Sequence, residues 1–162
     1  MAIYIVTHGE KKKGPNPRMT KKGFEQIGKI KSIIPADPVM VISGTGRRHV
    51  EVAKTLNLKI DRFTSVMGCA DSSEIIDGQK KIRLPDGTVL EPSIYTTLKD
   101  MSPAVKQFIS KLPDGTIICA GRPLLKMLSY AEPKSGSVYK VNGVNGCITE
   151  LVATGEVEEV SA

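Results

Sequence analysis

The stretch Ile3-Tyr4-Ile5-Val6-Thr7-His8-Gly9-Glu10 decides the expected fold, because a short apolar run leads directly into a histidine. An apolar run of this length that ends at a glycine and a charged loop is typical of a buried β-strand. In open α/β sheets, ligands bind where such strands end. A histidine at that edge can act as a base, a ligand or a nucleophile near neutral pH. His8, one of only two histidines in the chain, is therefore the first candidate site residue.

The bulk composition predicts one globular domain over residues 1–162, because 162 residues can bury a core without disulfides or metal and no linker interrupts them. The net charge of +6 favours anionic partners such as phosphates, nucleic acid or a membrane surface. Aromatic residues make up only 4% of the chain, which argues against stacking platforms for single-stranded nucleic acid. Nucleic-acid binding is a weaker hypothesis than phosphate binding, because no recognised binding motif accompanies the charge.

The cysteines and the N-terminus predict a cellular setting. Cys69, Cys119 and Cys147 are widely spaced and form no C-x-x-C pair, which disfavours zinc and thioredoxin-type chemistry. Free thiols in a reducing compartment are the preferred interpretation. No basic segment precedes a long apolar stretch, and no apolar run approaches the length of a membrane span. We expect a cytoplasmic protein without membrane contact.

Strands and helices are expected to alternate along the chain. Besides the first strand, the apolar patterns predict helices over 21–34, 47–56, 103–112 and 121–130, strands over 39–42 and 116–119, and hairpins over 82–90 and 137–154. Ser102 is the expected N-cap of the third helix, with Pro103 at its first position. The hairpin turns are expected at 85–87 and at either 142–143 or 145–146. This alternation predicts an α/β fold, a three-layer α/β/α sandwich with a mainly parallel sheet.

Three predicted strands end before a loop and a helix, after His8, Ser43 and Cys119. Their ends should meet at one edge of the sheet, where helix N-termini present free N–H groups to anions. The segment Ser43-Gly44-Thr45-Gly46-Arg47-Arg48 fits such a site, because glycines admit a phosphate and arginines bind its oxygens. It is neither a dinucleotide fingerprint, since His49 occupies the third-glycine position, nor a P-loop. An anion site is favoured over a solvated turn.

Several segments together resemble a known family. The strand ending in His8 is followed by Met19-Thr20-Lys21-Lys22-Gly23, and Val41-Ile42-Ser43 precedes Arg48 and Ala53. This order resembles the histidine phosphatase superfamily, also called phosphoglycerate mutase-like. Its first strand ends in Arg-His-Gly-Glu, a Leu-Thr-x-x-Gly segment opens its first helix, and Ser-Ser-x-x-x-Arg-x-x-x-Thr-Ala follows its second strand. The short chain is most similar to the small phosphohistidine-phosphatase branch.

The resemblance implies a phosphoglycerate mutase-like fold and a phosphatase activity. His8 matches the nucleophile, which takes the phosphoryl group as a phosphohistidine that water hydrolyses. Arg48 matches a phosphate-holding arginine, and we expect Thr7, Arg18 and Gly121 to complete the phosphate site. No metal or organic cofactor is implied. The expected partner is a phosphorylated small molecule or a phosphoprotein, and the oligomeric state is left open.

Two residues depart from the family pattern. Thr7 stands where the family has the arginine before the nucleophile, and Ala120 stands where it has a second histidine. Losing one such donor typically lowers the rate by about 10²–10³. The residues that could supply a replacement cation are Arg18, Arg47, His49 and Arg122. The alternative function is a catalytically impaired relative, a pseudoenzyme that acts as a phosphate- or anion-binding regulatory or interaction module.

Other polar residues receive simpler interpretations. Glu74 is the nearest candidate for a proton donor but is interpreted as a solvated loop residue, and Glu10 as a structural acid. His49 is interpreted as a surface or packed residue, and Cys119 as a packed thiol. The run Lys11–Lys13 is interpreted as a solvated face that can steer anionic substrates.

Overall fold

The computed structural model describes residues 2–14, 17–44, 46–64, 74–83, 89–90, 98–142 and 146–153. In chain order its elements are β1 (Ala2–Thr7), α1 (Lys21–Gly28), β2 (Met40–Gly44), α2 (Arg47–Thr55), β3 (Arg62–Thr64), β4 (Glu74–Ile76), β5 (Gln79–Arg83), β6 (Val89–Leu90), α3 (Leu98–Ser110), β7 (Thr116–Ala120), α4 (Arg122–Met127), β8 (Ser137–Asn142) and β9 (Ile148–Ala153).

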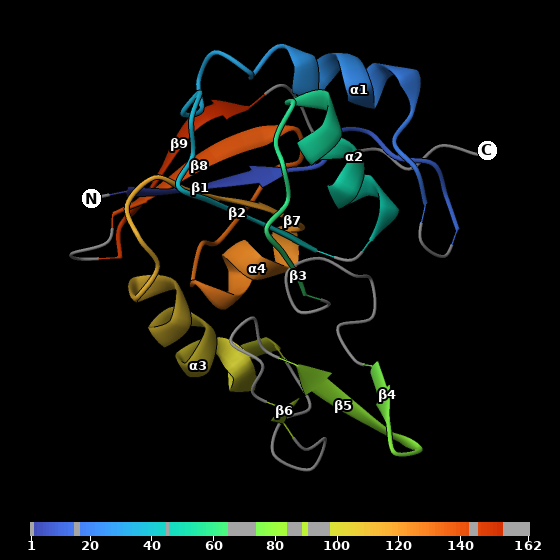
Figure 1. Ribbon diagram of the computed structural model, residues 1–162, viewed down its shortest axis with the longest axis vertical. Coiled ribbons are helices and arrows are strands. Elements are labelled where there is room, and N and C mark those ends of the chain that lie inside the picture. The colour runs from blue at the N-terminus through green and yellow to red at the C-terminus, as the bar shows by residue number, and fades with distance from the viewer. Residues whose placement is uncertain are drawn as a thin grey trace.

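The main sheet contains six strands in the order β3-β2-β7-β1-β8-β9 (Figure 1). Strands β3, β2, β7 and β1 run parallel, whereas β8 is antiparallel to both β1 and β9. The predicted α/β architecture with a parallel core is therefore confirmed. Because β1, β2 and β7 are parallel neighbours, their carboxyl ends meet at one edge, beside His8, Gly44 and Ala120.

Helices lie on both sides of this sheet: α1 and α2 on one side and α3 and α4 on the other (Figure 1). Alternate residues of β1 pack against the helices on the two sides, because successive side chains of a strand point to opposite faces. Ile5 belongs to the apolar cluster that contains Val105 of α3. Val6 belongs to the second cluster, with Val52 of α2. The near-continuous apolar sequence of β1 follows from burial on both faces.

The first helix is shorter than the predicted 21–34, because α1 ends at Gly28. Beyond it the chain continues in tighter turns, in which the backbone N–H of Ile30 donates to the carbonyl of Ile27 at 3.1 Å. Such bonds to the third residue back close tighter turns than the α-helix. Ile30 and Ile34 are still buried, so the apolar spacing that suggested a longer helix reflects burial rather than continued α-helix.

The third helix begins earlier than predicted. Helix α3 already includes Leu98, so the expectation that Ser102 caps it and Pro103 opens it is wrong. A proline inside a helix removes one backbone hydrogen bond and crowds the carbonyl four residues before it, but the helix can still continue through it at that cost. The end of α3 at Ser110 is two residues before the predicted end.

The smaller sheet has the strand order β4-β5-β6. Its pairing of Ile82 with Leu90 confirms the predicted hairpin, whose turn at 84–88 lies outside the described residues. The β4–β5 hairpin was not predicted; it turns at Asp77-Gly78, where both residues have positive φ. The predicted hairpin of β8 and β9 is confirmed, and its residues 143–145 lie outside the described part, as do Thr45 and Cys69.

Candidate functional site

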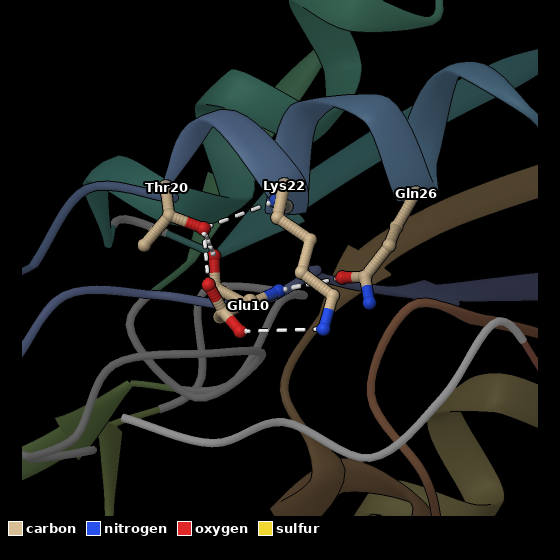
Figure 2. Close-up of polar contacts among 5 residues, drawn as sticks. Glu10, Thr20, Lys22 and Gln26 are labelled. Carbon is tan, nitrogen blue, oxygen red and sulfur yellow. Dashed lines mark hydrogen bonds and ion pairs between the residues drawn. The ribbon is translucent and has the colours of Figure 1, made fainter. Parts of the chain in front are cut away.

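The loop after β1 is anchored to the start of α1 by Glu10 (Figure 2). The Thr20 hydroxyl donates to Glu10 Oε1 at 2.8 Å and accepts from the Gly23 N–H at 3.1 Å, which caps the helix. The Glu10 backbone N–H donates to Gln26 Oε1 at 2.8 Å, and Lys22 Nζ lies 3.9 Å from Glu10 Oε2. These contacts support the structural interpretation of Glu10.

Two glycines permit the close approach of this loop to α1. A Cβ atom on Gly23 would lie 2.2 Å from the Glu10 carbonyl oxygen, and one on Gly9 would lie 2.5 Å from the Gly23 carbonyl oxygen. Both distances are too short for any side chain, because the opposing atoms belong to the backbone. The Thr20-x-x-Gly23 pattern thus combines a helix cap with the space that the loop after His8 requires.

His8 is buried at the end of β1, with 4% of its surface exposed. Its Nδ1 lies 2.8 Å from the carbonyl oxygen of Gly9. A carbonyl oxygen only accepts, so we assign the ring proton to Nδ1 in the neutral imidazole. Nε2 then carries the free lone pair, the form that a nucleophilic histidine needs.

Burial lowers the pKa of His8 from its ordinary value of 6.5 to about 4. The hydrogen bond to Gly9 raises this pKa, whereas the charges of Arg48, Lys11 and Arg122 lower it further. Both burial and nearby cations disfavour a second proton on the ring. His8 is therefore neutral at pH 7.

Three separate segments bring cations toward His8. Arg48, 6% exposed, comes from the first turn of α2 after the N-cap Gly46. Lys11 follows β1, and Arg122 is the first residue of α4. Lys11 belongs to the run interpreted as a solvated face that can steer anions, and its charge acts on His8. Arg47, by contrast, is exposed on α2.

The predicted phosphate-site residue Thr7 is fully buried and bonded to the segment before β8. Its hydroxyl donates to the Lys134 carbonyl at 2.8 Å and accepts from the Ser137 N–H at 3.0 Å. The Gly136 N–H donates to the carbonyl of His8 at 2.7 Å, so the same segment also holds the next residue. Sequence patterns had given no sign of this contact across the chain.

Arg18, also predicted to bind phosphate, lies against a carboxylate. Its Nε donates to Glu51 Oε2 at 2.9 Å, and 57% of its side chain is exposed. The other oxygen of Glu51 accepts from the Met19 N–H at 2.9 Å, and Met19 Sδ accepts from the Gly9 N–H at 3.2 Å. Glu51 therefore joins α2 to the loop beside His8. The sequence signal for this role was an acid on the buried face of α2, next to Val52.

The end of β7 contributes small and apolar groups to the same edge. Ala120 is fully buried beside Thr7 in the parallel register, and the buried Gly121 is the N-cap of α4. Burial raises the pKa of the Cys119 thiol to about 12, so this cysteine stays protonated at neutral pH. It packs in the apolar cluster beneath α1 and α2, as its interpretation as a packed thiol predicted.

The other histidine reaches the same place from α2. The rings of His8 and His49 form an edge contact, with centroids 5.5 Å apart and planes inclined by 61°. His49 is fully buried, so the interpretation as a packed residue holds and the interpretation as a surface residue does not.

Glu74 was interpreted as a solvated loop residue, but it is the first residue of strand β4.

The described part of the chain contains neither a candidate metal site nor a candidate membrane-spanning helix. No group of three or more His, Cys, Asp or Glu side chains there could hold a metal ion. Likewise, the described helices include none long and apolar enough to span a membrane.

Solved structures with the same fold include three from bacteria. TTHB049 from Thermus thermophilus has a TM-score of 0.61 at 14% identity, over 93% of this chain and 99% of that one. A phosphoglycerate mutase from the same organism has a TM-score of 0.63 at 14% identity, over 94% and 99%. The Rv3214 product of Mycobacterium tuberculosis has a TM-score of 0.59 at 15% identity, over 94% and 96%. No family model and no curated protein matches. At such low identity the likeness shows the fold alone.

Proposed function

We propose that this chain is a histidine phosphatase superfamily member that hydrolyses a phosphomonoester or a phosphorylated protein side chain through His8. The observation that carries the proposal is the state of His8: a buried neutral imidazole whose Nδ1 is bonded to Gly9, with cations acting on it. A phosphoglycerate mutase with the same fold supports the superfamily. Within this proposal the domain is a three-layer sandwich of the small phosphohistidine-phosphatase branch, cytoplasmic and without a cofactor.

The proposed reaction has two steps. Nε2 of His8 attacks phosphorus in line with the departing oxygen, so the N–P bond forms as the P–O bond breaks. The freed alkoxide or phenoxide takes a proton from solvent. Water then attacks the phosphohistidine, releasing inorganic phosphate and restoring the neutral ring. Arg48 offsets the negative charge on the phosphoryl oxygens, and Lys11 and Arg122 add positive potential around them.

Turnover of an aryl phosphate tests this proposal, because a phenolate departs without a general acid. His8→Asn should abolish turnover. Arg48→Gln should lower kcat/KM by roughly 100-fold to 1,000-fold, the usual effect of losing one preorganised donor to the reacting group. Arg47→Gln is the matched control, since this neighbouring arginine is exposed, and its rate should stay close to that of the native protein. Equal rates for native protein and His8→Asn would refute the phosphatase.

A second function is favoured by Thr7 and Ala120, which bring no charge to the strand ends. A chain without enough cationic donors for catalysis can still bind an anion, as a regulatory or interaction module. Calorimetric titration with inorganic phosphate separates the two functions. Binding that Arg48→Gln weakens, together with no turnover, identifies the module; turnover that depends on His8 identifies the enzyme.

A further inference from the structure

The two histidines of the chain lie in direct contact, although they come from different elements. His8 ends the β1 segment and His49 lies in the first turn of α2. Their rings meet edge to face at 5.5 Å between centroids, one of the arrangements that aromatic rings prefer. Neither ring is a surface group: His8 is 4% exposed and His49 is fully buried.

The orientation of the His8 ring determines which nitrogen can react. Its Nδ1 is bonded to the Gly9 carbonyl, which leaves Nε2 as the free nitrogen. A half-turn of the ring about the Cβ–Cγ bond would place a carbon against that carbonyl and lose the hydrogen bond. One hydrogen bond is a modest restraint by itself. The edge contact with His49 is a second restraint of another kind, because it limits tilting of the ring plane away from the Gly9 carbonyl.

Both restraints belong to one connected frame. The Gly9 N–H donates to Met19 Sδ at 3.2 Å, and the Met19 N–H donates to Glu51 Oε1 at 2.9 Å. Glu51 lies two residues after His49 on α2. The carbonyl that holds Nδ1 and the ring that packs against His8 are therefore fixed relative to each other by Met19 and Glu51.

Packing alone does not account for a histidine at position 49. Burying an imidazole carries a desolvation penalty that an apolar side chain of similar size avoids. Two of the buried residues that flank His49 in α2, Arg48 and Glu51, are charged, and the next two, Val52 and Ala53, are apolar. The buried polar residues of α2 are those beside His8 and its loop: the charge of Arg48 acts on His8, the ring of His49 contacts it, and Glu51 accepts from the Met19 N–H. Val52 and Ala53 instead belong to the apolar cluster.

We propose that His49 is a positioning residue for His8, holding the ring in the orientation that bonds Nδ1 to Gly9 and leaves Nε2 free for phosphorus. The inference rests on the proposed function of His8 as the phosphoryl acceptor. His49 itself makes no contact with the phosphoryl group in this mechanism. It acts through the ring of His8.

Nitrogen-15 NMR of the imidazole rings tests the proposal directly. Each His49 variant leaves His8 as the sole histidine, so its tautomer is read from one ring. His49→Phe retains an aromatic edge and should keep the Nδ1–H tautomer. His49→Leu removes the ring and should raise the ratio of Nε2–H to Nδ1–H tautomers by about twofold to tenfold, the range expected for one aromatic contact. If the leucine variant does not fold, His49→Gln takes its place.

Val52→Ala is the control, because it perturbs the buried face of α2 without altering either ring. It should lower stability and leave the His8 tautomer unchanged. A folded His49→Leu protein with the native tautomer ratio would overturn the inference. Because this readout needs no phosphorylated substrate, a shifted tautomer in a protein without turnover supports the positioning role and refutes only the phosphatase. With turnover, His49→Leu should lower kcat at unchanged KM.

Discussion

Thr7 and Ala120 lie side by side where the parallel strands β1 and β7 end. The hydroxyl of Thr7 is bonded to the backbone of Lys134 and Ser137, and Ala120 is fully buried. Neither side chain therefore brings a charge to this edge of the sheet. The positive charge around His8 comes instead from α2, from the loop after β1 and from α4.

Replacing Thr7 tests its role in holding β8 to β1. Thr7→Val removes the hydrogen bonds of the hydroxyl to the backbone of Lys134 and Ser137, and the buried Ser137 N–H loses the acceptor that the hydroxyl provides. We expect a loss of about 1–3 kcal/mol in the free energy of unfolding, the usual effect of a buried unsatisfied group. Thr7→Ser keeps the hydroxyl and should lose only about 0.8 kcal/mol, for one buried methyl group. Urea denaturation compares them; equal losses would contradict the assignment.

Replacing Gly23 or Gly28 of α1 with alanine should change the stability of the protein in opposite directions. A Cβ on Gly23 would meet the Glu10 carbonyl at 2.2 Å, so Gly23→Ala should destabilise the protein by about 1–3 kcal/mol. Gly28 has no atom within 4 Å of an added Cβ, so Gly28→Ala should stabilise it by about 0.5–1 kcal/mol. Thermal denaturation measures both changes. A shift of the same sign in the two variants would be inconsistent with this packing.

The lowered pKa of His8 predicts a pH-dependent stability. Its folded-state pKa of about 4 is below the ordinary 6.5, so between these values the unfolded chain binds more protons. The free energy of unfolding should therefore rise as the pH increases through this window and reach its full value above pH 6.5. The contribution is at most about 3 kcal/mol.

Urea denaturation of native protein and His8→Asn at a series of pH values isolates this contribution from other titrating groups. The difference in unfolding free energy between the two proteins should change between pH 4 and 6.5 and stay constant at higher pH. A difference that is independent of pH would show that His8 titrates normally.

The cations around His8 predict a selective loss of phosphate affinity. Lys11→Gln and Arg122→Gln should each weaken binding of inorganic phosphate by about twofold to fivefold, the effect of a single solvent-screened charge. Their neighbours provide the controls: Lys12→Gln and Lys126→Gln alter exposed charges that are not among those acting on His8. Calorimetric titration measures all four. Equal weakening by every variant would indicate a general surface potential instead of a defined site.

The local sequence was sufficient for the elements that place His8. The strand before His8 and the helix cap at Thr20 could both be predicted from short stretches of sequence. This is because strands, helix caps and turns depend mainly on neighbouring residues. The predicted helix boundaries were wrong where tertiary contacts outweighed these local preferences. Ile30 and Ile34 are buried in turns after α1, and α3 begins more than one turn before Pro103.

The composition of the site depended on the order of strands in the sheet. Strand β7, formed late in the chain, lies between β1 and β2, and this places the start of α4 near His8. The contacts of His8 with His49, and of Thr7 with Lys134, likewise join residues far apart in the sequence. No local pattern encodes such contacts, because they arise only when separate segments pack on the same core. The sequence by itself determined that the first strand ends at a histidine; tertiary packing determined that this histidine is neutral, held by Gly9 and His49, and subject to the charges of three cations.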